Sequence, residues 1–313
     1  MNKILFLLKR REDYSETLHS SHLGLSTGLF NSASFMKDML RQNGIESYLE
    51  VVTDNNCIDR EVTNYRPTHV IIEALWVVPE KFYILQKLHP NVKWIVRLHS
   101  EMPFMAQEGI ALNWIADYLS YKNVYLGINA PRMMEETQLY AESIYGKDKV
   151  KDKIVYMPNY YPQDNKPTKV YDKSRDYIDI GCFGAIRPLK NHMVQAIAAV
   201  KFAEHIGKKL RFHVNSGRIE MKGEPVTHNL RDMFINLNNK GHELINHIWT
   251  PREKFLELCS QMDIGMQCNF SETFNIVGAD LISQGVPFVG SSEIPWASCI
   301  FNARPAYSDE IFE

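Results

Sequence analysis

The chain has 313 residues and a mass of 36.3 kDa, a length that suggests two domains or one large one. Its 35 lysines and arginines balance 37 aspartates and glutamates, and neither half of the chain carries a basic arm or an acidic tail. This balance excludes a binder that depends on a diffuse cationic surface, although it leaves room for a local basic site.

The sequence contains no apolar run that approaches the ~20 residues needed to span a bilayer. The apolar stretch at residues 4–8 is too short for a signal sequence and lacks a small-residue cleavage site, so we expect it to be a buried first strand. The five cysteines show no metal or redox spacing. We therefore expect reduced thiols in a cytoplasmic protein without a transmembrane segment.

Short apolar runs alternate with longer amphipathic segments in the first half of the chain. The pattern predicts strands at residues 3–8, 47–52, 68–75, 92–98 and 123–128, and helices at 28–42, 79–88 and 131–145. From residue 159 to 176 the pattern lapses into a polar stretch with two prolines, which indicates a linker.

The alternation then restarts. The second half predicts strands at residues 178–183, 210–214, 243–249, 264–268 and 286–289, and helices at 191–206, 226–239, 251–261 and 274–284. We therefore predict an α/β protein with two Rossmann-like domains that face each other across a cleft. The first domain would cover residues 1–160, the linker 161–176, and the second domain 177–313.

The strongest chemical signal is the polar loop between the strand at 264–268 and the helix at 274–284. Free backbone amides near Thr273 and Phe274 at a helix start favour a phosphate or a sugar hydroxyl. Glu272 would face that ligand, and Asp280 follows about two helical turns later. The alternative is structural, with Ser271 capping the helix and Glu272 in its first turn.

The second signal follows the strand at 178–183. Gly184 predicts a turn in which the backbone can approach a ligand, and Arg187 and Lys190 precede a helix. Two cations in this position can neutralise a diphosphate. The alternative is a solvated pair of surface cations.

Together, the two signals resemble the C-terminal domain of retaining glycosyltransferases of the family-4 type, which have the GT-B fold. Gly184 and Lys190 match the family's glycine turn and the lysine that follows it, and Glu272 matches the first residue of its Glu-seven residues-Glu motif. Asn215 falls in the family's glycine loop after the second strand. The chain is also similar to phage-encoded glycosyltransferase-like proteins.

The sequence departs from this family at two positions. Asp280 stands where the family's second Glu binds the ribose hydroxyls, so the charge is kept on a shorter side chain. Ala185 replaces the usual Arg, so Arg187 would have to supply that contact from two residues later.

The resemblance implies transfer of a sugar from a nucleotide-sugar donor, with retention of anomeric configuration and without a metal or another cofactor. Glu272 would hold the transferring sugar and Lys190 the leaving diphosphate, and His99, which follows the strand at 92–98, would lie near the sugar. Donor binding would further involve the residues already singled out in the second domain, Gly184, Arg187, Asn215, Thr273, Phe274 and Asp280.

The sequence leaves the donor sugar and base, the oligomeric state and the acceptor open. The acceptor could be a modified DNA base or a glycan. Two other function classes also remain open. One is a GT-B sugar-nucleotide epimerase or hydrolase, and the other is a non-catalytic nucleotide-binding module.

Overall fold

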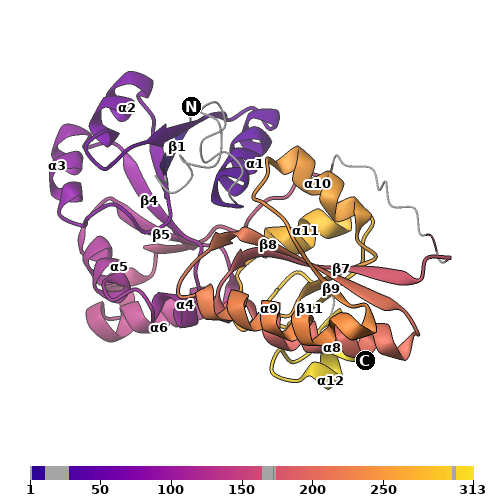
Figure 1. The fold of residues 1–313 in the computed structure, drawn as a ribbon. Helices are drawn as coiled ribbons and strands as arrows, with labels where there is room; N and C mark the ends of the chain where they lie inside the picture. Colours follow the sequence, from indigo (N-terminus) through magenta and orange to yellow (C-terminus); the bar gives the residue numbers. More distant parts are fainter. Residues whose placement is uncertain (1, 11–27, 164–171, 173, 298–300) are drawn as a thin grey trace. The chain divides into compact units, whose positions relative to one another are not determined.

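The computed structural model describes residues 2–10, 28–163, 172, 174–297 and 301–313. The chain divides into two compact units, Met1–Tyr161 (unit 1) and Pro162–Glu313 (unit 2), which Figure 1 shows in indigo to magenta and in red to yellow. Much of the predicted linker, residues 164–171 and 173, lies outside the described residues. Among the described helices, none is long and apolar enough to cross a bilayer.

Unit 1 is built on a parallel sheet whose described strands follow the order β2-β1-β3-β4-β5-β6. The strands are β1 (Lys3–Lys9), β2 (Glu46–Val52), β3 (His69–Glu73), β4 (Lys93–Leu98), β5 (Val124–Ile128) and β6 (Ile154–Tyr156). The helices between them are α1 (Gly28–Gln42), α2 (Ile58–Tyr65), α3 (Lys81–Leu88), α4 (Met102–Met105), α5 (Ala111–Ser120), α6 (Pro131–Tyr145) and α7 (Lys147–Val150).

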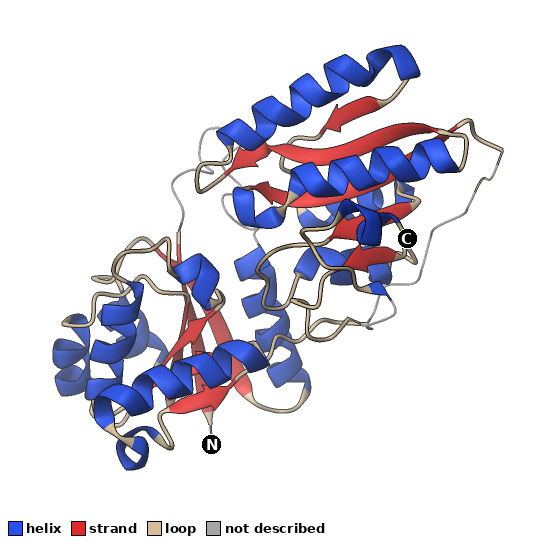
Figure 2. Ribbon diagram, turned by 90° about the horizontal axis from the view of Figure 1, so that it is seen from below, coloured by secondary structure: helices blue, strands red, loops and turns tan. Residues whose placement is uncertain are grey.

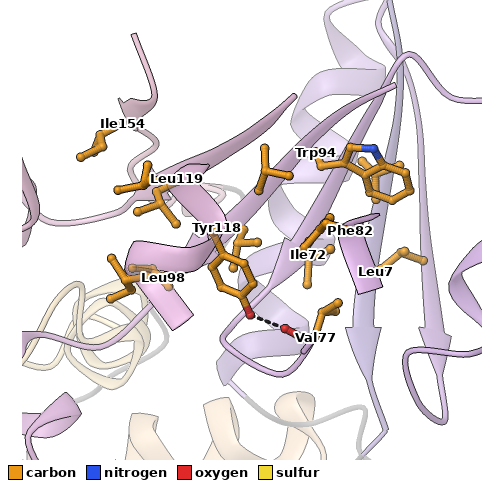
Figure 3. Close-up of a cluster of buried hydrophobic side chains, with 14 of the residues drawn as sticks. Leu7, Ile72, Val77, Phe82, Trp94, Leu98, Tyr118, Leu119 and Ile154 are labelled. Carbon is orange, nitrogen blue, oxygen red and sulfur yellow. Dashed lines mark hydrogen bonds between the residues drawn. The ribbon is translucent and has the colours of Figure 1, made fainter. Parts of the chain in front are cut away.

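Both faces of the unit 1 sheet are buried, which explains why its strands are apolar runs rather than alternating ones. Along β1, Phe6 packs with the residues of α1 on one face, whereas Leu5 and Leu7 join the larger core on the other face. Figure 3 shows this larger core, in which Phe82 and Trp94 meet edge to face. The sheet is thereby fixed between two helical layers (Figure 2).

One buried hydrogen bond in this core can be tested directly. Tyr118 of α5 is fully buried, and its hydroxyl donates to the carbonyl of Val77 (Figure 3). We expect Tyr118→Phe to lower the free energy of unfolding by about 1–3 kcal/mol, because the carbonyl loses its donor inside the core. Urea denaturation would measure the change. Tyr156→Phe, at a half-exposed position, is the control, and equal effects of the two substitutions would contradict the expectation.

Unit 2 repeats the architecture with the described strand order β11-β10-β7-β8-β9, again parallel. The strands are β7 (Tyr177–Ile186), β8 (Lys209–Ile219), β9 (Glu243–Asn246), β10 (Ile264–Gln267) and β11 (Phe288–Gly290). The helices are α8 (His192–His205), α9 (Glu224–Leu237), α10 (Arg252–Gln261), α11 (Ile276–Ser283) and α12 (Ser308–Phe312), with short 3-10 turns at Pro188–Lys190 and Asn238–Lys240.

Two apolar clusters cover the two faces of this second sheet. Residues of α8, α9 and α12 pack on one face, with the rings of Phe212 and Phe234 stacked, and residues of α10 and α11 pack on the other face around Phe183. The predicted α/β class with two Rossmann-like sheets is therefore confirmed. The sequence patterns missed the elements α2, α4, α5, α7, β6 and α12.

The strand β7 runs further than the sequence predicts. Gly184 does not begin a turn, because β7 continues through it to Ile186. Gly184 has φ +110°, and the pairing with β8 shifts register between Cys182 and Ala185. The glycine thus allows a bulge inside the strand, a role that a side chain at this φ would oppose.

Candidate functional site

The candidate residues of unit 2 follow the two strands at its topological switch point. Connectivity reverses between β7 and β10, and ligands of open α/β sheets bind beyond the carboxyl ends of the strands at such a point. Lys190 follows β7, and Glu272 follows β10. The fold therefore brings two residues 82 positions apart to one edge of the sheet.

An ion pair joins these two residues, with Nζ of Lys190 donating to Oε2 of Glu272. The side chains are 11% and 12% exposed. Burial by itself would raise the pKa of the Glu272 carboxyl, but the Lys190 ammonium and then the Arg187 guanidinium hold this pKa below its ordinary value of 4.5. Glu272 is therefore negatively charged at neutral pH.

Two side-chain amides hold the same carboxylate. Oε2 of Glu272 also accepts from Nδ2 of Asn269 at 2.9 Å and from Nδ2 of Asn275 at 3.3 Å. The other oxygen, Oε1, accepts from the backbone N–H of Thr273 at 3.3 Å. Three side-chain donors thus converge on Oε2, and Oε1 keeps the capacity to accept a further bond from a hydroxyl.

The backbone of Lys190 is fixed by a third buried amide. Gln195 on α8 is fully buried, and its Nε2 donates to the carbonyl of Lys190 at 2.8 Å. Its Oε1 accepts from the N–H of Cys268 at 2.8 Å. Gln195 therefore ties the segment after β7 to the end of β10, which sets the separation of Lys190 and Glu272.

The helix after Glu272 begins later than the sequence predicts. α11 starts at Ile276, and Asn275 is its N-cap, with φ +59° and Oδ1 accepting from the N–H of Gly278 at 2.7 Å. The alternative in which Ser271 caps the helix is therefore wrong. The same side chain, Asn275, both caps the helix and donates to Glu272.

Thr273 and Phe274 consequently lie ahead of the helix rather than in its first turn. Thr273 is buried, and the carbonyl of Phe274 accepts from the indole N–H of Trp296. The predicted two helical turns between Glu272 and Asp280 are also wrong, because residues 272–275 are not helical. One helical turn separates the start of α11 from Asp280.

Asp280 lies in an ion pair of its own. It sits on α11 at 3% exposure, and its carboxylate accepts from the guanidinium of Arg252 on α10. The sequence motif pairs Asp280 with Glu272, and the structure assigns each of these carboxylates a different cation. Binding of a ribose at Asp280 stays a prediction.

Arg187, Gly184 and Asn215 gather where β7 and β8 end. The N–H of Gly184 donates to Oδ1 of Asn215 at 3.0 Å, which braces the bulge. Arg187 follows β7 directly, and its guanidinium lies 3.5 Å from Oε2 of Glu220. The positive charge of Arg187 also helps to lower the pKa of the Glu272 carboxyl.

In unit 1, His99 lies in a separate buried cluster at the carboxyl ends of β3 and β4. Its Nε2 is 2.5 Å from Oε2 of Glu73, and its Nδ1 is 3.4 Å from Nδ2 of Asn129. Arg97 donates to both carboxylate oxygens of Glu73 at 3.2 and 3.4 Å, and also to Oδ1 of Asn159. Because an amide N–H only donates, Nδ1 of His99 accepts and Nε2 carries the proton toward Glu73.

The charges of this cluster compensate each other. Burial lowers the pKa of His99, and the attraction of Glu73 only partly opposes that effect. Burial would raise the pKa of Glu73, but Arg97 and His99 together hold it below its ordinary value. His99 is therefore a neutral imidazole at neutral pH, and Glu73 is an anion paired with Arg97.

The described residues show two further features, one about metal ligands and one about a hollow. Among them, no group of three or more His, Cys, Asp and Glu side chains has the arrangement of a metal site. A hollow of about 430 Å³ lies in unit 1 and is lined by residues between Val62 and Val92. It opens beside the beginnings of β3 and β4, the opposite end of these strands from Glu73 and His99, so we assign it no part in the site.

Comparisons by sequence find no relatives. No protein-family model matches the chain, and no curated protein matches it.

Solved structures do match. The N-terminal domain of trehalose-6-phosphate phosphatase from Candida albicans has a TM-score of 0.70 and 9% identity, over 100% of this chain and 88% of that chain. A UDP-forming trehalose-phosphate synthase from Burkholderia xenovorans has a TM-score of 0.68 and 12% identity, over 100% and 90%. An α-glucosyltransferase in complex with UDP and a 13-mer DNA containing an HMU base has a TM-score of 0.59 and 13% identity, over 93% and 80%.

These neighbours are similar in fold, and at such identities the likeness shows the fold alone. The predicted GT-B class of two Rossmann-like domains is confirmed by it.

Sequence reasoning missed the amides that hold the ion pair. Asn269, Asn275 and Gln195 carry no charge and belong to no metal or nucleophile pattern, so their contacts with the ion pair could not be read from such patterns. One signal was present, because asparagine is a preferred N-cap residue and Asn275 directly precedes an apolar helix. Arg218 and Glu220, at the end of β8, were missed because that strand was expected to stop at residue 214.

The lowered pKa of Glu272 predicts an acid-dependent stability. The pair with Lys190 stabilises the fold above the ordinary carboxyl pKa of 4.5, and this contribution is lost as the pH falls below it through the lower folded-state value. At pH 7 we expect Glu272→Gln to cost about 1.5–3 kcal/mol, the range for a hydrogen bond to a charged group. The difference from the wild type should shrink steadily below pH 4.5.

Urea denaturation at several pH values from about 3.5 to about 7, a range that includes the ordinary carboxyl pKa, would measure it. Glu253→Gln, which changes an exposed carboxylate at the start of α10, is the control. A cost of Glu272→Gln that stays constant across this range would show that the carboxylate contributes no charge interaction.

Proposed function

We propose that the protein is a glycosyltransferase that moves a sugar from a nucleotide-sugar donor to an acceptor hydroxyl or base, with the donor bound by unit 2. The observation that carries this proposal is the Lys190–Glu272 pair, which lies at the switch point of a Rossmann-like sheet and is held by buried amides. The GT-B fold supports it, because the structural neighbours include trehalose-phosphate synthases and an α-glucosyltransferase bound to UDP.

Lys190 has the chemistry needed at the leaving group. An ammonium carries three donors, and one of them reaches Glu272, so the others can contact phosphate oxygens. When the bond between the anomeric carbon and the diphosphate oxygen breaks, the electron pair stays on the diphosphate, the acceptor's hydroxyl oxygen bonds to the anomeric carbon, and the hydroxyl proton passes to the departing diphosphate. Lys190 and Arg187 would stabilise that growing charge, and pre-positioned cations are effective because they need no rearrangement during the reaction. The proposed chemistry therefore needs no metal ion.

Glu272 would hold the transferring sugar. Oε2 is engaged by three side-chain donors, so a sugar hydroxyl would bind at Oε1, beside the N–H of Thr273. Gly184, Asn215 and Phe274 would line the donor site through backbone and side-chain contacts, and Asp280 would contact the ribose. The role of His99 near the sugar is proposed from the family resemblance alone, because both of its ring nitrogens are engaged within unit 1, Nε2 with Glu73 and Nδ1 with Asn129.

The finer parts of the proposal come from the sequence resemblance. Retention of anomeric configuration and a phage-like origin are proposed on that basis, and a cytoplasmic location is proposed from the cysteine pattern of the sequence. For the acceptor, we retain both a modified DNA base and a glycan. The similarity in fold to the α-glucosyltransferase with bound DNA supports the modified DNA base as a candidate. A panel of nucleotide sugars in a thermal-shift assay would select the donor, because a ligand of the folded state raises the melting temperature.

The roles of Lys190 and Glu272 can be separated by two substitutions. We expect Lys190→Met to weaken UDP binding at least tenfold, about 1.4 kcal/mol, because a cation–phosphate contact is lost. Glu272→Gln should leave UDP affinity within about threefold of the wild type and lower turnover of the selected donor at least tenfold, because this residue contacts the sugar rather than the diphosphate. Calorimetric titration and a coupled assay for released nucleotide would measure the two effects.

The matched control is Lys201→Met, which removes a lysine from an exposed pair with Asp309. Wild-type affinity for UDP in Lys190→Met would contradict the assignment of the diphosphate site. Donor consumption that requires no acceptor would identify a hydrolase or epimerase, and UDP binding without any turnover would identify a non-catalytic module.

A further inference from the structure

Two arginines of unit 2 converge on one carboxylate beside the proposed donor site. Glu220 accepts from Nε of Arg218 at 2.7 Å through Oε1, and the same oxygen pairs with the second guanidinium nitrogen of Arg218. Its other oxygen, Oε2, lies 3.5 Å from Arg187. The three side chains are between 16% and 21% exposed, so the cluster is partly withdrawn from water yet still reachable from it.

The backbone places these groups together by a tight connection. β7 and β8 pair as far as Ile186 and Ile219, and the N–H of Glu220 donates to the carbonyl of Ile186 at 2.9 Å. Arg187 and Glu220 are therefore the first residues beyond a paired strand end. Arg218 also makes a cation–π contact, because its guanidinium lies 4.8 Å from the centre of the Trp249 ring.

The turn after Glu220 has an unusual backbone. Met221 and Lys222 have φ values of +47° and +64°, a region that residues with side chains rarely adopt. Gly223 closes the turn so tightly that a Cβ there would lie 2.1 Å from the carbonyl oxygen of Ile186. Strained backbone that the surrounding structure holds in place is concentrated at functional sites, and here it holds one carboxylate between two arginines.

The charges around this cluster favour another anion. Lys190, Arg187 and Arg218 supply three cations, whereas Glu272 and Glu220 supply two carboxylates. Arg187 connects both pairs, since it contacts Glu220 and also acts on the Glu272 carboxyl. Two guanidinium groups that face one carboxylate have the fork geometry that suits a phosphate group equally well.

We infer that Arg187 and Arg218 form a phosphate subsite and that the Glu220 carboxylate competes with phosphate for it. The inference rests on the proposed function for the identity of the ligand, which would be a phosphate of the nucleotide-sugar donor or a phosphate carried by the acceptor. Glu220 would then act as an internal counter-ion that a phosphate displaces. Arg218 would be a binding residue that the family resemblance does not supply.

If Glu220 competes with phosphate for the two arginines, substitutions of Arg218 and of Glu220 should change UDP affinity in opposite directions. Arg218→Gln removes half of the subsite, so it should weaken UDP binding at least about fivefold. Glu220→Gln removes the competing charge, so it should strengthen UDP binding about threefold or more. A purely structural ion pair predicts instead that both substitutions weaken binding, because Glu220 would then only hold Arg187 and Arg218 in place. Calorimetric titration of the whole chain with UDP would decide between them.

The exposed pair of Arg304 and Glu310 provides the matched controls Arg304→Gln and Glu310→Gln, which should leave UDP affinity unchanged. Melting temperatures of all four variants would separate lost binding from lost folding. If Glu220→Gln binds UDP as weakly as Arg218→Gln, or if neither substitution changes the affinity of a folded protein for UDP or for a sugar monophosphate, the subsite is refuted.

Affinities for a second set of ligands would show whether the phosphate belongs to the donor or to the acceptor. Loss of affinity in Arg218→Gln for UDP but not for UMP assigns the subsite to the donor's second phosphate, whereas loss for a sugar monophosphate alone assigns it to the acceptor. A wild-type protein that binds no nucleoside diphosphate would contradict the proposed function. Opposite effects of the two substitutions on inorganic pyrophosphate binding would still support the subsite in that case.

Discussion

The ion pair between Lys190 and Glu272 is the interaction on which the site in unit 2 depends. Two largely buried charges are costly to withdraw from water, and such a pair is sustained only when additional hydrogen bonds satisfy its remaining atoms. Here Asn269 and Asn275 satisfy the carboxylate, and Gln195 fixes the lysine backbone. The arrangement positions one cation and one carboxylate oxygen at the switch point, where the fold leaves strand ends open to a ligand.

Unit 1 uses the same physical device at the ends of its own strands. Glu73 is fully buried, and Arg97 and His99 together keep it charged. Burial, with a smaller contribution from the Arg97 charge, lowers the pKa of His99 and keeps it neutral, and Asn129 fixes which nitrogen accepts. Both units thus use buried hydrogen bonds to orient a single side chain, which is what a pre-organised binding site requires.

Sequence patterns could predict the two sheets because strands buried on both faces form long apolar runs between amphipathic helices. They could also place Lys190 and Glu272, since both lie where such runs end. Sequence patterns could not predict the contacts of these two residues, because a pattern along the chain does not show which distant amide lies next to a given carboxylate. Asp280 illustrates the limit: its spacing matches a motif, but its partner in the fold is Arg252. Gly184 shows the same limit, because a glycine in the sequence is equally consistent with a turn and with a bulge inside a strand.

The proposed function requires that a nucleoside diphosphate binds unit 2 at this switch point. Hydrogen–deuterium exchange with and without saturating UDP would locate this binding, because a bound ligand slows local opening where it binds. We predict slower exchange in peptides that cover residues 184–195 and 268–280, with Arg218 and Glu220 in a third protected segment. UDP binding that protects only peptides of unit 1, such as those around the hollow between Val62 and Val92, would contradict it.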